Sequence, residues 1–267
     1  MAMRDGRVVL VGIVSFLLVG AANAHIISDD VSFTYSGMTG PANWGDLSPD
    51  FAVCSGGKQQ SPIDIRKEDA SSKNQSLDKD YQDANATLVN NGFNIGVKME
   101  SYAGALNLNG KNYTLQQLHW HSPAEHTING VRHPAELHLL HRSDDGEISV
   151  VAILYKLGDA DPFLNQMMDQ LADLDKEVCK GDEEAHIPLG ILKNKQLQKE
   201  TRKYYRYMGS LTTPPCQEDV TWSILGKVRE MSLAQLNALR APLDSGYTKN
   251  ARPLQDLNDR KVELHQC

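Results

Sequence analysis

The sequence predicts a mainly β protein of one domain, with a few helices at its periphery. Val150 to Leu154 is almost continuously apolar and rich in β-branched residues, which is typical of a strand buried on both faces. Alternating residues from Asn107 to Leu115 surround an Asn109-Gly110 pair, the strongest short signal for a hairpin. No internal repeat or linker-like stretch divides the 267 residues. We therefore expect one domain over residues 25–267.

Two segments carry helix signals. Asp161 can cap a helix whose first position is Pro162, and apolar residues then recur at helical spacing as far as Leu174. Ser232 can cap a second helix, which Pro242 would stop. A further Asn129-Gly130 pair lies between the two histidine-bearing segments described below.

The charge balance excludes one class of partner. The net charge is -7, and charged residues make up an ordinary 23% of the chain. The longest basic clustering, Lys193 to Arg206, is diluted by Glu200 and several glutamines. Because no basic stripe is present, nucleic-acid binding is not expected.

The first 24 residues have the pattern of a signal peptide. Arg4 and Arg7 precede an apolar stretch from Val8 to Gly20 that is too short to span a bilayer comfortably. Small residues in Ala22–Ala24 predict cleavage before His25. A membrane anchor is the alternative. We expect a secreted protein without a membrane span in its mature part, or one that reaches a plastid by the secretory route.

Two further features agree with an oxidising secretory route. Asn74, Asn85 and Asn112 each begin a glycosylation sequon, although such triplets also arise by chance. The four cysteines are Cys54, Cys179, Cys216 and Cys267. Their spacing contains no CxxC motif, and it does not choose among the three possible fully paired connectivities.

The segment that ends at His121 can form a strand with a metal-binding face. Successive side chains of a strand alternate between faces, so Gln117, His119 and His121 would point one way. Leu118 and Trp120 would point into the core. Two imidazoles at i and i+2 can converge on one ion.

A second predicted strand, Ala135 to Arg142, offers a third ligand. It places Glu136, His138 and Leu140 on one face. If the two strands pair, His138 completes a three-histidine site, which suits zinc better than magnesium or calcium and leaves the fourth position open, as in catalytic sites.

Side chains beside the ligands can orient them. Gln117 and Glu136 share the predicted faces and can accept hydrogen bonds from the ring nitrogens that do not ligate. The alternative is that His119 and His121 are a solvated histidine pair. His126, His133 and His141 also lie nearby in the sequence, so clustering of histidines alone does not identify a metal site.

A proline-stiffened segment from Gly209 to Cys216 contains two threonines. A rigidly held Thr212 hydroxyl can accept a hydrogen bond from a zinc-bound hydroxide and donate one to a carboxylate such as Glu125. Composition alone would favour an ordinary proline-stiffened loop.

Together these motifs resemble the α-class carbonic anhydrases, and most closely their plant secreted branch, which includes dioscorin-like and nectarin-like proteins. The resemblance covers nearly the whole mature chain. It rests on Gly40–Trp44, Gln60–Ile65, Leu118–Ser122, Glu125–Thr127, Ala135–His138, Ser210–Pro215 and Asn250–Pro253.

The resemblance implies roles for individual residues. The family fold is a large, twisted, mostly antiparallel sheet with zinc at the bottom of a cone. His119, His121 and His138 correspond to the zinc ligands, Thr212 to the threonine that orients the zinc hydroxide, and Glu125 to the carboxylate that receives its hydrogen bond. Gln117 and Glu136 match the residues that hold the ligands.

Further positions follow from the same resemblance. Thr213 would line the substrate side, and an apolar pocket for carbon dioxide would be walled by Leu140, Val150, Leu211 and Trp222. Cys54 and Cys216 match the pair that is disulfide-bonded in secreted members. The implied reaction is reversible hydration of carbon dioxide to bicarbonate and a proton, so the expected ligands are zinc and these small molecules.

One position departs from the family pattern. No histidine fills the usual place of the proton shuttle, where Phe93 follows Asn90-Asn91-Gly92. Proton export is therefore expected to limit turnover. Two alternatives to a carbonic anhydrase remain: a non-enzymatic storage, defence or carbohydrate-binding protein on the same fold, and a zinc esterase. The sequence does not indicate an oligomeric state.

Overall fold

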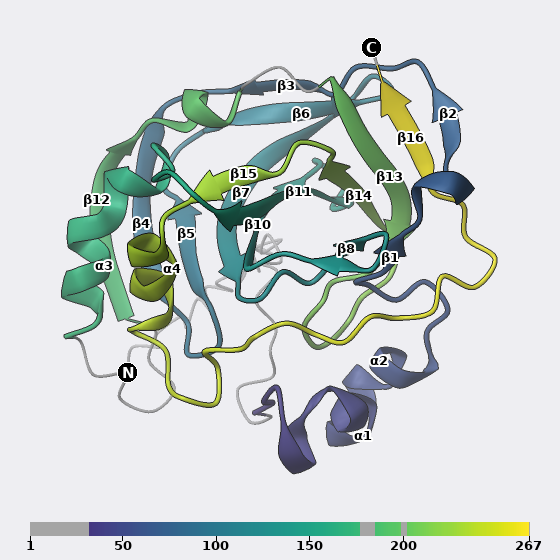
Figure 1. Ribbon diagram of the computed structural model, residues 1–267, viewed down its shortest axis with the longest axis horizontal. Helices are drawn as coiled ribbons and strands as arrows, with labels where there is room; N and C mark the ends of the chain where they lie inside the picture. The colour runs from purple at the N-terminus through teal and green to yellow at the C-terminus, as the bar shows by residue number, and fades with distance from the viewer. Residues whose placement is uncertain (1–31, 177–184, 199–201, 267) are drawn as a thin grey trace, which may run out of the picture.

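The computed structural model describes residues 32–176, 185–198 and 202–266. The predicted signal peptide, its cleavage site, Cys179 and Cys267 lie outside these ranges. In the described part, a 13-stranded mixed sheet dominates the molecule and a three-stranded sheet accompanies it (Figure 1). This agrees with the predicted fold class.

The strands of the described ranges all lie after residue 63. They are β1 (Asp64–Ile65), β2 (Ser71–Lys73), β3 (Asp78–Tyr81), β4 (Ala84–Asn90), β5 (Ile95–Met99), β6 (Gly104–Leu108), β7 (Lys111–His121), β8 (Thr127–Ile128), β9 (Val131–Arg132), β10 (Ala135–Arg142), β11 (Ile148–Leu157), β12 (Ala185–Leu192), β13 (Lys203–Gly209), β14 (Val220–Leu225), β15 (Arg229–Met231) and β16 (Glu263–Gln266).

The helices are short. The α-helices are α1 (Trp44–Leu47), α2 (Val53–Gly56), α3 (Met168–Leu174) and α4 (Leu233–Arg240), and the 3₁₀ helices are η1 (Gly37–Thr39), η2 (Pro41–Asn43), η3 (Pro49–Phe51), η4 (Lys67–Asp69), η5 (Leu164–Met167) and η6 (Asn194–Leu197).

Most neighbouring strands are antiparallel. The main path of the large sheet runs β12-β4-β5-β7-β10-β11-β14-β13-β16-β2. Its parallel pairs are β11 with β14, β11 with β15, and β16 with β2. The centre of the sheet therefore contains β7 and β10, the two strands that carry the histidines.

Both Asn-Gly pairs form tight hairpins. Asn109 and Gly110 join β6 to β7, with φ of 53° and 84°. Asn129 and Gly130 join β8 to β9, with φ of 49° and 73°. Two successive residues with positive φ are what a two-residue turn needs to match the twist of its strands, and this explains the choice of Asn-Gly.

The two predicted helices are present, with one difference. Asp161 Oδ1 accepts hydrogen bonds from the backbone N–H groups of Phe163 and Leu164, but Pro162 is not helical. The helical segment begins two residues later, at Leu164, as the 3₁₀ helix η5 with Phe163 at its N-cap, and continues as α3. Ser232 caps α4 through a reciprocal capping box with Gln235, and α4 ends before Pro242.

Apolar residues fill both faces of the sheet. One cluster joins Leu118, Trp120, Leu137 and Leu139 to the inner faces of α3 and α4, which lie at the left of the sheet in Figure 1. A second cluster, which includes Val150, lies on the opposite face. Within the three described ranges, no helix is long and apolar enough to cross a membrane.

Candidate metal centre

Pairing of β7 with β10 places three histidines on one face of the sheet. The register sets His138 directly opposite His119, with His121 two residues further along β7. Their ring nitrogens form a group within 4.8 Å of one another. His121 and His138 are buried and His119 is half-buried. The sheet therefore brings together the three predicted ligands.

Each imidazole is held by its other nitrogen. His119 Nδ1 donates to Gln117 Oε1 at 2.9 Å, and His138 Nε2 donates to Glu136 Oε1 at 2.8 Å. His121 Nδ1 donates to the backbone carbonyl of Asn250 at 2.7 Å. These bonds leave Nε2 of His119, Nε2 of His121 and Nδ1 of His138 as lone-pair donors.

The geometry of these three nitrogens fits a zinc ion. His119 Nε2 and His138 Nδ1 are 3.2 Å apart, near the roughly 3.3 Å expected for two nitrogens on tetrahedral zinc with bonds of ~2.0–2.1 Å. His121 Nε2 is buried without a hydrogen-bond partner among the described residues. Burial also lowers the pKa of His121 to about 4 and lowers that of His138, which favours the neutral form that binds metals.

Glu136 organises the floor of the site. Its Oε2 accepts the backbone N–H groups of Glu125 and His126, both at 2.8 Å. Its Oε1 also accepts from His126 Nδ1 at 2.7 Å. Burial opposes ionisation of Glu136, but His126 and His138 hold its pKa well below the usual range. An ionised Glu136 can thus orient His138 as an acceptor.

Glu125 faces the three histidines. Its Oε2 lies 3.5 Å from His121 Nε2 and 4.0 Å from His138 Nδ1. Its Oε1 accepts the backbone N–H of Arg252 at 2.9 Å. Burial raises the pKa of Glu125 to about 7, opposed by His138 and by the Thr212 hydroxyl. Thr212 is therefore close enough to lower the pKa of Glu125. Glu125 Oε2 nevertheless accepts no hydrogen bond of ordinary geometry from a described residue.

The loop that carries Thr212 is anchored at several points. The indole N–H of Trp222 donates to the carbonyl of Ser210 at 2.9 Å, and the N–H of Cys216 donates to the carbonyl of Thr213 at 2.8 Å. Cys216 is disulfide-bonded to Cys54 in α2, with Cα atoms 5.0 Å apart. The disulfide implied by the resemblance is present.

The residues predicted to form an apolar wall lie together. Leu140 pairs with Val150, and Val150 pairs with Trp222. The Trp222 ring lies 4.8 Å from the ring of His138. Leu140 and Leu211 are half-buried and pack against the same cluster. The wall therefore borders the histidine group on the β10 side.

Sequence reasoning gave no role to several residues of this site. His126 Nε2 and Tyr207 Oη are 2.7 Å apart, and Tyr207 Oη is 2.7 Å from Ser61 Oγ. Arg252, almost wholly buried, donates to Gln60 Oε1 and to the carbonyl of Cys54. A signal was available: Ser61, His126, Asn250 and Arg252 all occur in the motifs quoted above.

Phe93 packs in an aromatic cluster, and the asparagines of the three sequons lie at the surface. The Phe93 ring is 5.0 Å from that of Phe33, in an aromatic cluster with Trp44. The three sequon asparagines are exposed, and they are Asn74, Asn85 and Asn112.

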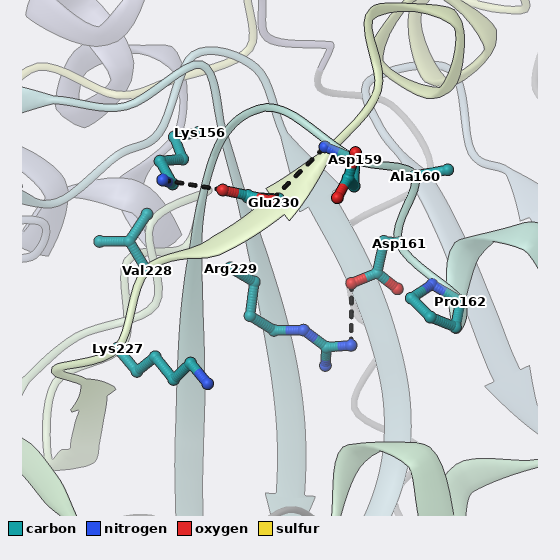
Figure 2. A pocket seen from close by; sticks show the side chains of 9 residues that line it. All are labelled: Lys156, Asp159, Ala160, Asp161, Pro162, Lys227, Val228, Arg229 and Glu230. Atoms are coloured by element: carbon teal, nitrogen blue, oxygen red, sulfur yellow. Dashed lines mark hydrogen bonds and ion pairs between the residues drawn. The ribbon is translucent and has the colours of Figure 1, made fainter.

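A separate hollow contains none of the predicted site residues. It has a volume of about 450 Å³ and is lined by the nine residues of Figure 2. Most of its charges are paired, because Arg229 contacts Asp161 at 2.8 Å and Lys156 contacts Glu230 at 2.8 Å. The histidine group therefore remains the candidate site.

Comparison with known proteins agrees with this geometry. The family model described as eukaryotic-type carbonic anhydrase matches residues 39–266. Alpha carbonic anhydrase 7 of Arabidopsis thaliana is 42% identical over 251 residues, which cover 92% of this chain and 90% of that protein.

Two solved structures are similar over most of the chain. Dioscorin complexed with ascorbate has a TM-score of 0.84 at 36% identity, covering 88% of this chain and 98% of the other. Alpha-carbonic anhydrase from Thermovibrio ammonificans, in complex with the inhibitor sulfanilamide, has a TM-score of 0.77 at 38% identity, covering 87% and 99%. The chain belongs to the eukaryotic-type carbonic anhydrase family.

Proposed function

We propose that this protein catalyses the reversible hydration of carbon dioxide to bicarbonate and a proton, with zinc bound by His119, His121 and His138. The observation that carries the proposal is the set of three converging lone-pair nitrogens, each on a ring whose other nitrogen is held. Zinc in a three-histidine site supplies a Lewis acid that lowers the pKa of bound water to ~7, a value known for carbonic anhydrases.

Thr212 and Glu125 would position the attacking oxygen. An ionised Glu125 would accept a hydrogen bond from the Thr212 hydroxyl, so that the Thr212 oxygen could only accept a hydrogen bond from the oxygen that attacks. This selects the orientation of the attacking lone pair. The backbone N–H of Arg252 and the disulfide at Cys216 support this arrangement by holding Glu125 and the loop.

The apolar wall would hold the substrate beside the metal. Carbon dioxide has no net charge or hydrogen-bond donor, so an apolar surface next to a polar centre is a suitable resting place. Leu140, Val150, Leu211 and Trp222 form that surface, and Thr213 would line its polar edge. Bicarbonate, which is charged and strongly hydrated, leaves such a surface readily.

We further propose that the mature chain starts at His25, follows the secretory route and is glycosylated at one or more of Asn74, Asn85 and Asn112. The disulfide and the exposure of the three asparagines support this. The final location is then extracellular, or a plastid reached by that route.

The competing function is that of a storage, defence or carbohydrate-binding protein. Dioscorin has the same fold and has been solved in complex with ascorbate, so a protein of this fold can bind a ligand other than carbon dioxide. Intact ligands, with Thr212 and Glu125 beside them, favour the enzyme.

One experiment separates the two. Zinc content and carbon dioxide hydration are measured on the same purified sample, before and after chelation. We expect about one zinc per chain and activity that disappears with the metal and returns with it. A fully folded protein that binds no zinc and lacks activity would overturn the proposal.

A further inference from the structure

The proposed reaction must deliver one proton per turnover from the metal centre to solvent. Bulk water accepts a proton poorly near neutral pH, whereas an imidazole, with an ordinary pKa of ~6.5, accepts it at little cost. Phe93 has no titratable atom, and its ring packs against Phe33. A proton acceptor must therefore be sought elsewhere on the metal-binding face of the sheet.

Most other histidines in the described ranges are badly placed for this task. His126 and His141 are completely buried, and His141 contacts Tyr81 on the opposite side of the sheet. His265 is buried and stacks on Tyr204. His133 lies in the connection between β9 and β10, outside the strands that carry the ligands. His186, on β12, is the exposed histidine that remains.

Strand register places His186 in the same row as the ligands. His186 pairs with Val89, Val89 with Gly96, Gly96 with His119, and His119 with His138. Paired residues of adjacent strands project from the same face. The next residues, Ile187 and Leu88, pack into the core on the other face, which confirms the direction.

This row crosses five strands that lie side by side in Figure 1: β12, β4, β5, β7 and β10. Three strand spacings separate His186 from His119, roughly 14 Å between their backbones. That span is too long for a direct transfer and suits a chain of several waters that ends on an exposed acceptor.

Val89 is the apolar member of this row and is buried, whereas Gly96 and Asn94 lie beside His119. Gly96 has no side chain, and a Cβ placed there would lie 3.2 Å from the carbonyl oxygen of Leu118, 3.8 Å from His119 Cβ and 3.9 Å from Asn94 Oδ1. Asn94 is 4% exposed, and its Oδ1 has no hydrogen-bond partner among the described residues. A buried amide oxygen with no partner is costly unless water occupies it.

We propose that His186 is the terminal proton acceptor of this active site, reached by water that passes Asn94 and the notch above Gly96. This inference rests on the proposed function. Among the described residues, Lys98 lies on the same face of the sheet, two residues along β5 from Gly96. Helix α3, which carries Asp169 and Asp173, contacts β12.

The test uses His186→Gln, with His133→Gln, in the connection between β9 and β10, as the matched control. Both zinc-loaded proteins are assayed by stopped flow in weak and in imidazole buffer. His186→Gln should lower kcat about tenfold in weak buffer, leave kcat/KM unchanged and recover in imidazole. Attack on carbon dioxide precedes proton export, so only kcat should respond, and His133→Gln should match the unmodified protein.

A second readout does not depend on activity. A high-resolution crystal structure of the zinc-loaded protein should show ordered waters running from the metal site past Asn94 to the His186 ring. Unchanged kcat in His186→Gln, or a structure in which that path is dry, would overturn the inference while normal kcat/KM upholds the proposed function. Failure of the unmodified protein to hydrate carbon dioxide with zinc bound would overturn both.

Discussion

His119 Nε2 and His138 Nδ1 face each other at 3.2 Å across strands β7 and β10, and both are lone-pair nitrogens because Gln117 and Glu136 accept the protons of the opposite ring nitrogens. Two lone pairs at this distance would repel, and a cation bound between them would remove the repulsion. The register of the two strands thus creates the arrangement on which the proposed metal site depends.

This relationship leads to the first prediction. His138→Ala removes one of three ligands and should abolish stoichiometric zinc binding, with a loss of kcat/KM of at least about 1,000-fold. Metal analysis after dialysis and a hydration assay measure this. His133→Ala is the control and should keep both properties. Full zinc content with normal activity in His138→Ala would show that the ligand assignment is wrong.

The Thr212 hydroxyl should act on catalysis and not on metal binding. Thr212→Val keeps the side-chain shape but removes the hydrogen bond that orients the attacking oxygen. We expect kcat/KM to fall about 100-fold while zinc stays at one per chain. Thr221→Val, on β14 outside the histidine group, should retain activity. Equal activities of the two variants would contradict the role of Thr212.

The disulfide should stabilise the fold and the Thr212 loop together. Cys54 and Cys216 are 162 residues apart in sequence, and closing so long a loop stabilises by about 4–5 kcal/mol in the chain-entropy model. A Cys54→Ser, Cys216→Ser double variant should therefore melt about 10–15 °C lower and lose activity below its melting range. Peptide mapping should find the bond in the unmodified protein; free thiols there, or equal melting temperatures, would contradict this.

Stability should fall as pH decreases because His141 is buried. Burial lowers the pKa of His141 to about 4, and the nearby positive charge of Lys79 lowers it further. The hydrogen bond to the carbonyl of Ser149 opposes this shift, and the other ring nitrogen lies 2.9 Å from the Tyr81 hydroxyl. The unfolded chain takes up this proton near pH 6.5 and the folded protein only near pH 4. Stability is thus complete above pH 6.5 and falls by roughly 3 kcal/mol toward pH 4.

Urea unfolding at several pH values tests this effect. The variant His141→Gln lacks the titrating group, so its free energy of unfolding should be lower at pH 7 but should change less between pH 7 and pH 5. Parallel pH profiles for the two proteins would show that another group is responsible.

Phe93→His should add a proton acceptor near the usual shuttle position. We expect higher kcat in weak buffer and nearly unchanged kcat/KM, because carbon dioxide hydration itself is untouched. Loss of the contact with Phe33 should lower the melting temperature slightly. If kcat in the unmodified protein is already high and independent of buffer, an efficient acceptor exists; His186 is then the first residue to replace, and His25 at the predicted new N-terminus the second.

The local pattern of the sequence was sufficient for each strand and turn that builds the site. Alternation predicted that His119 and His121 share a face opposite Leu118 and Trp120, and Asn109-Gly110 predicted a hairpin, because both depend only on neighbouring residues. The same reasoning expected one continuous helix after Asp161, whereas the first turn is the 3₁₀ helix η5. The hydrogen bonds that Asp161 accepts from the N–H groups of Phe163 and Leu164 are compatible with either form, so the local signal distinguishes neither the form nor the first residue of the helix.

The tertiary structure decided which residues that are distant in the chain contact each other at the site. Periodicity shows that His138 faces the same way as Glu136, but only the register of β10 on β7 sets it opposite His119. The acceptor for His121 is a backbone carbonyl 129 residues away, at Asn250. A carbonyl is the same in every residue, so no side-chain pattern marks it.

The Cys54–Cys216 disulfide is another contact between residues that are distant in the chain. The spacing of the cysteines allowed three fully paired connectivities, and only the resemblance selected one. The sequence by itself thus determined which side chains each strand presents to the metal-binding face. The tertiary structure decided which of them meet, because strand register and loop closure depend on packing over the whole sheet.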